Sequence, residues 1–187
     1  MLRTEITTVL ERLAIRLPVL HPLFSLYYDE TIEKEIALGQ ITASDRVLFI
    51  GGGPFPWTAM RVAEKTGATV DILDNNQEAV QAAKKVIQRH TYASQLSVIY
   101  GAGEGVAAEG YSVVYIARQA QPHLHILENI WPTCEKGARI IVRQHIRLPE
   151  VQSFFKNVVK LVFSSGEVVE STSYNERSLM FIKSYDS

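Results

Sequence analysis

The stretch Val47–Thr58 restricts the fold of this chain more than any other part of the sequence. It reads Val-Leu-Phe-Ile-Gly-Gly-Gly-Pro-Phe-Pro-Trp-Thr, so an apolar run passes directly into glycines and prolines. Apolar residues that end in glycine predict a buried strand that opens onto a tight turn, and a helical pattern begins near Trp57. A second apolar run, 68–73, ends at Asp74. Strand, glycine turn, helix, strand and acid together predict a nucleoside-binding βαβ unit.

The glycines and the acid each have a physical reason to stand in this order. Gly51 and Gly53 allow backbone angles and a close ligand approach that a Cβ atom would prevent. Asp74 follows Gly53 at about the 20-residue spacing expected of an acid that accepts hydrogen bonds from both ribose hydroxyls. The pattern therefore predicts that this carboxylate holds the sugar of a nucleoside ligand.

Two prolines in the turn indicate which nucleoside is bound. Pro54 and Pro56 remove two backbone N–H donors that a pyrophosphate would need, and Pro56 also replaces the third glycine of G-x-G-x-x-G. S-adenosylmethionine (SAM) has no phosphate, so it loses little from these prolines. Its ribose still needs the acid, and its methionine part needs a close glycine turn. The sequence favours SAM over a dinucleotide. The alternative is an α/β domain whose glycines only make a turn and bind no nucleoside.

Length and composition limit the other classes of function. The 187 residues fit one domain, and the net charge of −1 gives little electrostatic support for a nucleic-acid partner. The single cysteine, Cys134, excludes an internal disulfide and fits a reducing compartment. His123 and His125 are two residues apart, so a helix would point them to different faces and no metal site is predicted. With no signal peptide or membrane span in the sequence, we expect a cytoplasmic protein without a membrane partner; a homodimer stays open.

Hydrophobic periodicity predicts alternating strands and helices. The predicted helices cover residues 4–17, 28–38 (closed by Gly39), 57–66, 77–90, 122–131 and 151–162 (closed by Gly166). The predicted strands cover residues 46–50, 69–73, 96–100, 112–117, 139–143, 167–172 and 178–183, with a polar turn over 173–177.

This alternation predicts an α/β fold with a mostly parallel, seven-stranded sheet and a terminal antiparallel strand pair. Residues 1–40 are expected to form a helical cap in front of residues 41–187, the ligand-binding domain, within one structural unit. Ligands of such sheets bind beyond the carboxyl ends of the strands. Those ends carry Gly51, Asp74, Gly101 and Arg118, so the cap would lie within reach of the ligand.

The predicted layout resembles class I SAM-dependent methyltransferases, which share a Rossmann-like fold, and the proline turn narrows the resemblance further. The turn Phe49–Thr58 resembles the nicotianamine synthase family, whose turn reads roughly [FV]-[IV]-G-[SG]-G-P-x-P-x-T. Three further stretches resemble this family in order and spacing: a helix end at Glu35–Gly39, a strand at Tyr111–Ala117 and a strand at Gly137–Arg143. The similarity covers about residues 27–150.

This resemblance implies a specific reaction, the transfer of the 3-amino-3-carboxypropyl group of SAM to a small amine or amino acid, with methylthioadenosine as the by-product. It implies that Glu35 acts as the base, or as the acidic group that holds the acceptor amine. Tyr28, with Tyr27 beside it, is expected to line the same pocket and to share in proton transfer. The residues expected to bind SAM are Gly51, Gly52, Gly53, Pro54, Asp74, Asn75, Gly101, Ala102, Ala117 and Arg118.

The chain also departs from the pattern of the family. Ala102 stands where related SAM enzymes usually carry an aspartate near the adenine, and Glu104 is the candidate substitute. Arg118 and Gln119 replace small apolar residues, and the loop over 144–149 is shorter. Arg118, Arg143 or Arg147 are candidates to pair with a substrate carboxylate. Two alternatives therefore stay open: a small-molecule methyltransferase on the same site, and a non-catalytic SAM-binding module.

Overall fold

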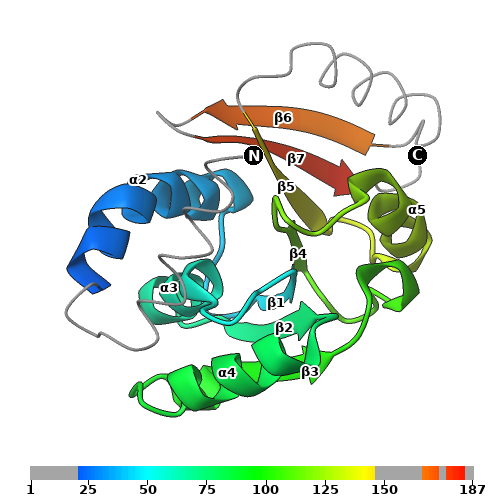
Figure 1. The fold of residues 1–187 in the computed structure, drawn as a ribbon. Coiled ribbons are helices and arrows are strands. Elements are labelled where there is room, and N and C mark those ends of the chain that lie inside the picture. The colour runs from blue at the N-terminus through cyan, green and yellow to red at the C-terminus, as the bar shows by residue number, and fades with distance from the viewer. Residues whose placement is uncertain (1–20, 146–165, 173–175, 184–187) are drawn as a thin grey trace.

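The computed structural model describes residues 21–145, 166–172 and 176–183. Within this part of the chain, strands and helices alternate as far as β5, and the sheet lies at the centre of the molecule (Figure 1). The helices predicted over residues 4–17 and 151–162 lie outside the described residues.

The described strands form one sheet of seven strands in the order β3-β2-β1-β4-β5-β7-β6. Strands β1 to β5 pair in parallel, and β7 runs antiparallel to both β5 and β6. The predicted α/β class and the mostly parallel sheet with a terminal antiparallel pair are confirmed. The bounds are β1 Arg46–Ile50, β2 Thr69–Asp74, β3 Leu96–Tyr100, β4 Val113–Ile116, β5 Arg139–His145, β6 Gly166–Thr172 and β7 Glu176–Lys183.

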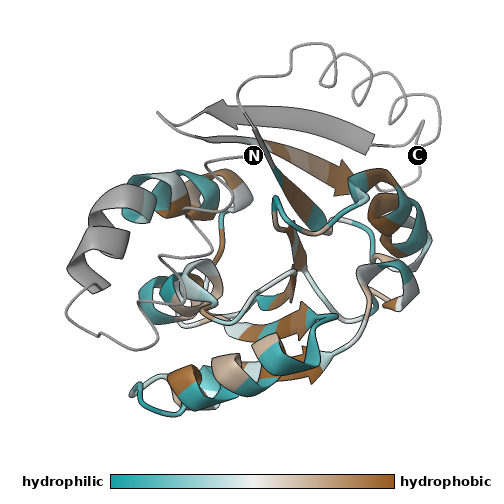
Figure 2. Ribbon diagram, viewed as in Figure 1, coloured by the Kyte–Doolittle hydropathy of each residue, from teal (hydrophilic) through white to brown (hydrophobic). Residues whose placement is uncertain are grey.

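Helices cover both faces of this sheet. The α-helices are α2 His21–Gly39, α3 Trp57–Thr66, α4 Gln77–Ile87 and α5 His123–Thr133, and two short 3-10 turns are η2 Ala93–Gln95 and η3 Gly103–Gly105. Apolar residues of α2, α3 and α4 pack in one core cluster, and those of α5 pack in a second cluster on the opposite face. Figure 2 shows hydrophobic residues concentrated in the central strands. Burial on both faces explains why these strands read as continuous apolar runs.

Some boundaries differ from the prediction. Helix α2 begins at His21 rather than at residue 28, and its left-handed terminal residue is Gln40, with φ 46°, rather than Gly39. Gly39 is needed for space, because a Cβ there would lie 3.0 Å from Cδ1 of Ile141. Gly166 begins β6 instead of ending a helix, because it pairs with Lys183.

Ion pairs join α2 to α3. The carboxylate of Asp29 accepts hydrogen bonds from Arg61, with 2.6 Å between Oδ2 and Nη2, and Glu33 pairs with Lys65 at 2.6 Å. Below these pairs, Ile32 is fully buried. Helix α2 is therefore held against the middle and the last turn of α3. None of the helices in the described ranges is both long enough and apolar enough to span a membrane.

Candidate active site

The turn after β1 passes close to the end of β2. The Gly51 N–H donates to the Leu73 carbonyl at 2.8 Å, and the φ angles of Gly51 and Gly53 are 86° and 66°. Both angles lie in the left-handed region that favours glycine. Gly52 is needed for space instead, because a Cβ there would lie 2.2 Å from Cγ2 of Ile72. Each glycine of the turn therefore has its own reason to lack a side chain.

The carboxylate of Asp74 is held by the backbone on both sides. Oδ2 accepts the Gly53 N–H at 2.7 Å, and Oδ1 accepts the Asn76 N–H at 2.9 Å. Asn76 in turn caps α4 by accepting the N–H groups of Glu78 and Ala79. Each carboxylate oxygen can accept a second hydrogen bond. Asp74 is thus oriented in advance, with capacity left for two hydroxyl donors.

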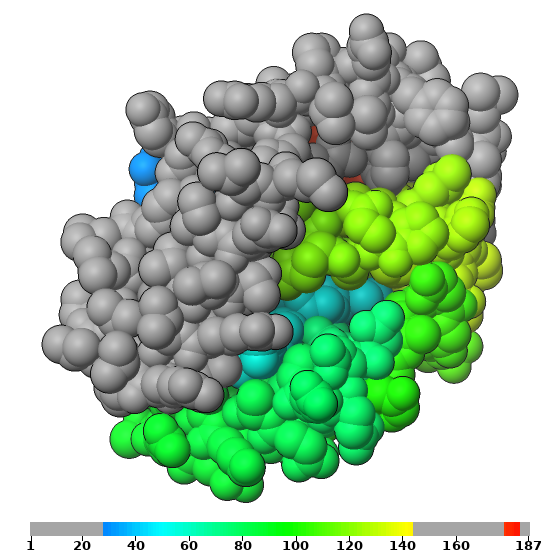
Figure 3. All heavy atoms as spheres, in the orientation of Figure 1, coloured from blue at the N-terminus to red at the C-terminus, as the bar shows by residue number. Residues whose placement is uncertain are grey.

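A cavity of about 170 Å³ lies beside Asp74, and we call it the nucleoside cavity. The residues that line it are Ile50, Gly51, Leu73, Asp74, Asn75, Gly101, Gly103, Glu104, Gln119, Ala120, Gln121 and Ile126. They come from the carboxyl ends of β1, β2 and β3 and from the segment after β4. Figure 3 shows the cyan atoms around β1 recessed between the turquoise atoms after β2 and the light-green atoms after β4.

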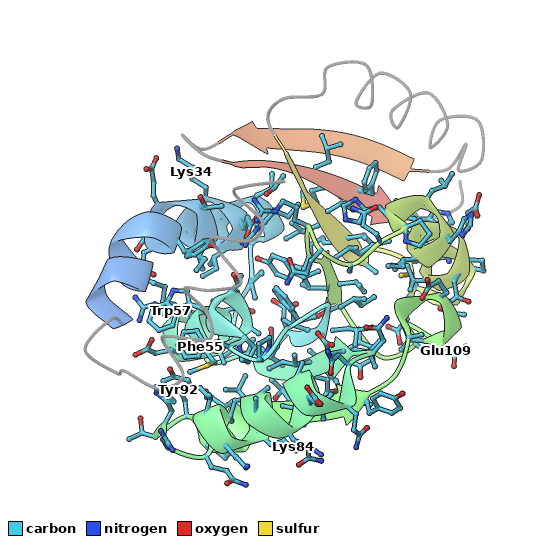
Figure 4. The ribbon with its side chains drawn as sticks, in the orientation of Figure 1. Lys34, Phe55, Trp57, Lys84, Tyr92 and Glu109 are labelled. Atoms are coloured by element: carbon cyan, nitrogen blue, oxygen red, sulfur yellow. The ribbon has the colours of Figure 1, made fainter. Side chains whose placement is uncertain are left out.

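A second, narrower cavity of about 50 Å³ lies on the other side of the glycine turn, and we call it the aromatic cavity. Its lining residues are Tyr28, Phe49, Gly52, Phe55, Pro56, Trp57, Thr58, Ala117, Arg118, Gln119 and Arg143. The rings of Phe55 and Trp57 stack with their centroids 5.7 Å apart at the start of α3 (Figure 4). This cavity therefore combines flat apolar walls with two arginines.

Glu35 lies behind the aromatic cavity rather than on its surface. It is 1% exposed, and its two oxygens accept hydrogen bonds from Nε and Nη2 of Arg143 at 2.9 and 2.5 Å. The Ser178 hydroxyl donates to the same carboxylate, and the Thr58 hydroxyl accepts from Nη1 of Arg143 at 3.1 Å. A buried charge persists only when it is paired and hydrogen-bonded in this way.

The role predicted for Glu35, as the base or as the acidic group that holds the acceptor amine, stays a prediction. Three of the roughly four lone-pair positions of a carboxylate are already used by Arg143 and Ser178. Arg143, whose guanidinium belongs to the cavity lining, connects this carboxylate to the aromatic cavity. The sequence placed Glu35 near the pocket but gave no sign of the strand residues that pair with it.

The Tyr115 hydroxyl lies in the same buried region. It has no hydrogen-bond partner among the described residues, and its ring stacks on Phe49 with 5.2 Å between centroids. Burial, followed by the negative charge of Glu35, raises the pKa of Tyr115 well above its usual value. This phenol therefore stays protonated at neutral pH and keeps a free O–H donor beneath the aromatic cavity.

The segment after β4 forms a tightly bonded turn between the two cavities. Nε2 of His123 donates to the Ala117 carbonyl at 3.0 Å, and the Ala120 N–H donates to the same carbonyl at 3.0 Å. Burial lowers the pKa of His123, against these backbone hydrogen bonds that raise it. The amide of Gln119 donates to the Gly51 carbonyl at 2.8 Å. The turn is thereby attached to the glycine turn.

Thiol and metal chemistry receive no support from the residues described. Cys134 is buried, and burial raises the pKa of its thiol to about 11. At neutral pH it is therefore a thiol and not a nucleophilic thiolate. Residues 21–145 and the two described strands that follow hold no group of three or more His, Cys, Asp or Glu side chains that could bind a metal ion.

The structure brings most of the predicted site residues to these cavities. Gly51, Asp74, Asn75 and Gly101 line the nucleoside cavity, and so does Glu104, the suggested substitute for a missing acid. Tyr28, Gly52, Ala117 and Arg118 line the aromatic cavity. Gly53 acts through Asp74. Neither Pro54 nor Ala102 is among the described residues that line either cavity, and their assignment to SAM binding stays a prediction.

Sequence reasoning missed Phe55, Trp57 and Thr58 as cavity residues and considered Gln119 only as a departure from a family pattern. Their positions within and just after the proline turn were a usable signal, because residues next to a ligand-binding turn commonly line the site. Arg147 lies outside the described residues.

Comparison with known proteins agrees with this arrangement. A mutant of MtNAS in complex with S-adenosylmethionine superposes with a TM-score of 0.76 at 20% identity, covering 97% of this chain and 73% of that one. An S-adenosylmethionine-dependent methyltransferase, assigned as such in Methanococcus maripaludis, gives 0.73 at 14% identity, covering 91% of both chains. The fold is therefore the Rossmann-like fold of class I methyltransferases.

The family is narrower than the fold. The model of the family described as "Nicotianamine synthase protein" matches residues 16–169, which is most of the chain. The protein belongs to the nicotianamine synthase family. A curated relative, L-histidine 2-aminobutanoyltransferase from Yersinia pestis, is 23% identical over 116 residues, which are 62% of this chain and 43% of the relative. The chain thus spans less than half the length of that relative.

Proposed function

We propose that this protein is a SAM-dependent transferase that moves the 3-amino-3-carboxypropyl group of SAM to a small amine or amino acid and releases methylthioadenosine. The observation that carries the proposal is the pair of cavities that meet at the glycine turn. One is built for a nucleoside around Asp74, and the other joins aromatic walls to an anchored arginine, Arg143. Family membership and the 2-aminobutanoyltransferase relative support the same type of transfer.

The nucleoside cavity suits the adenosyl part of SAM. Asp74 has acceptor capacity for both ribose hydroxyls, and Glu104 lies across the cavity with a carboxylate that can accept from an adenine amino group. The prolines beside the turn leave few N–H donors for a phosphate, which SAM does not need. SAM is consumed in the proposed reaction, so it is a substrate, and its sulfonium supplies the leaving group.

The aromatic cavity suits an acceptor that carries a carboxylate. Arg143 is held by Glu35 and Thr58 in one orientation, so its guanidinium is presented to the cavity in a defined direction. Tyr28 lines the same cavity from α2 and is our candidate for contact with the acceptor amine. The amine must lose a proton before it attacks, and fixed neighbours that orient it lower the cost of reaching that geometry.

We also propose that the predicted cap, residues 1–40, covers the aromatic cavity. Helix α2 is the part of this cap that the structure describes. Tyr28 in the cavity lining and the ion pairs of Asp29 and Glu33 to α3 support this role. A cytoplasmic location and a homodimer remain predictions from the sequence.

Methyl transfer is the second candidate. A methyltransferase assigned in Methanococcus maripaludis shares the fold over 91% of both chains, which supports this alternative. The two reactions use the same sulfonium and differ in the carbon that the acceptor attacks.

The product separates the two candidates. We would incubate the protein with SAM and a pool of small amines and amino acids, and quantify methylthioadenosine and S-adenosylhomocysteine by mass spectrometry against a no-protein control. Protein-dependent methylthioadenosine, with an acceptor heavier by the aminocarboxypropyl group, is the expected result. Protein-dependent S-adenosylhomocysteine alone would show a methyltransferase instead.

A further inference from the structure

We propose that Gln119 determines which carbon of SAM faces the acceptor, and hence whether this site transfers an aminocarboxypropyl or a methyl group. The inference rests on the proposed function, because it concerns the orientation of SAM in that same site. Gln119 is a lining residue of both cavities. It therefore lies where the two cavities adjoin.

The side-chain amide of Gln119 donates a hydrogen bond to one specific backbone acceptor. Its Nε2 donates to the Gly51 carbonyl at 2.8 Å, across the mouth of the glycine turn. The space there is narrow, because a Cβ added to Gly51 would lie 2.9 Å from the Cβ of Ala120 and 3.4 Å from that of Ala117. The amide thus occupies the Gly51 carbonyl, which a ligand ammonium in the nucleoside cavity could otherwise use as an acceptor.

The chemistry of a sulfonium makes this position decisive. With the ribose held at Asp74, the sulfur carries two further carbons, the methyl group and Cγ of the aminocarboxypropyl tail. The two must point in different directions, one beside the glycine turn and one toward the aromatic cavity. The tail carries an ammonium that needs an acceptor, whereas the methyl group is small and apolar and needs none.

Gln119 biases this choice. When its amide holds the Gly51 carbonyl, a tail on the glycine-turn side would have to break that hydrogen bond and find room beside Ala120. A methyl group fits there without either cost. The tail is then directed toward the aromatic cavity, where its Cγ faces the acceptor.

The two orientations lead to different balanced reactions. With the tail in the aromatic cavity, the acceptor amine attacks Cγ, the S–Cγ bond breaks, its electron pair stays on sulfur, and neutral methylthioadenosine leaves. With the methyl group there, the S–CH₃ bond breaks in the same way and S-adenosylhomocysteine leaves. In both cases the amine releases one proton.

The segment that carries Gln119 is stiff enough to impose such a bias. His123 and the Ala120 N–H both bind the Ala117 carbonyl, and Gln121 binds the Arg118 carbonyl at 3.0 Å. Gln121 offers a matched control, because its amide is bonded within its own turn, does not reach Gly51, and belongs only to the nucleoside cavity.

The test is the product ratio of Gln119→Ala against the unaltered protein, with SAM and the acceptor that the unaltered protein uses. The ratio of S-adenosylhomocysteine to methylthioadenosine should rise about fivefold or more, the size expected for the loss of one neutral hydrogen bond. Gln119→Leu keeps the bulk but not the donor, so its ratio should rise less. Gln121→Ala should leave the ratio unchanged, whatever it does to the rate.

Each outcome is decisive. An unchanged ratio in Gln119→Ala, or an equal rise in Gln121→Ala, would overturn the role of Gln119 while leaving aminocarboxypropyl transfer intact. If the unaltered protein forms no methylthioadenosine with any acceptor, both proposals fail. Circular dichroism establishes that each variant is folded, and Gln119→Leu replaces Gln119→Ala as the deciding variant if the latter does not fold.

Discussion

The two cavities of this protein are built in opposite ways. The nucleoside cavity takes its key groups from consecutive segments, the glycine turn after β1 and Asp74 at the end of β2, and its hydrogen bonds are mostly to backbone. The aromatic cavity is assembled around a buried ion pair whose members are 108 residues apart in the chain. Local backbone geometry therefore defines the nucleoside cavity, and long-range side-chain packing defines the aromatic cavity.

This difference predicts different responses to mutation. Variants around the nucleoside cavity should act through close packing of the turn or through ligand binding. Variants around the aromatic cavity should act first on folding, because the groups there are buried charges.

The largest effect is expected for Glu35→Ala. It leaves the Arg143 guanidinium buried without its counter-charge, which should cost about 3–5 kcal/mol of unfolding free energy. Glu30→Ala is the control on the same helix, because the Glu30–Lys34 pair is exposed and should contribute less than about 1 kcal/mol. Urea unfolding measures both. Equal effects of the two variants would show that the buried pair has no special role.

The double variant Glu35→Leu with Arg143→Met sharpens the same comparison. Replacing both charges by apolar groups of similar volume removes the unpaired charge, so the double variant should be more stable than Glu35→Ala. It should nevertheless lose transfer activity, because Arg143 is then absent from the cavity. Retained activity would remove this arginine from the proposed function.

Gly52→Ala should give the next largest effect. The new methyl group would meet Cγ2 of the buried Ile72 at 2.2 Å, and overpacking of this kind costs about 1–3 kcal/mol. Gly105→Ala is the matched control, because nothing lies within 4 Å of a Cβ at that position. Thermal unfolding compares the two, and a Gly105 variant as unstable as the Gly52 variant would contradict the packing argument.

Asp74→Asn should weaken SAM binding by about tenfold or more, since hydrogen bonds to a charged acceptor contribute about 1.5–3 kcal/mol. Asp71→Asn is the control on the same strand. Hydrogen bonds from Ser97, Tyr111 and Arg46 outweigh burial and lower the pKa of Asp71, so its loss should reduce stability and leave binding unchanged. Calorimetric titration with SAM and with methylthioadenosine should show similar losses for Asp74→Asn, because both share the ribose.

The smallest effect concerns pH. Burial lowers the pKa of His123 below its usual 6.5, so the unfolded chain takes up a proton before the folded protein does. Stability from this residue is complete above pH 6.5 and falls as the pH drops toward the folded pKa. Urea unfolding at pH 7.5 and 5.5 should show a smaller pH dependence for His123→Gln than for the unaltered protein.

Much of the fold was predictable because its signals are local. The strand β1, the helix α3 with its terminal Gly67 and the strand β3 have the predicted bounds. Each is defined by a run of apolar residues between glycines or polar turns. The start of α2 was not predicted, because a proline such as Pro22 usually indicates a break in a helix. The helix instead includes Pro22 in its first turn, where a missing N–H costs nothing.

The sequence by itself determined the nucleoside cavity, because the glycine turn and the acid at the end of the next strand lie close together along the chain. Only the tertiary structure decided the aromatic cavity. The pairing of Glu35 with Arg143 and Ser178, and the reach of Gln119 to Gly51, join elements that no spacing rule connects. A buried charge is stable only beside its partner, and the sheet order decides which partner that is.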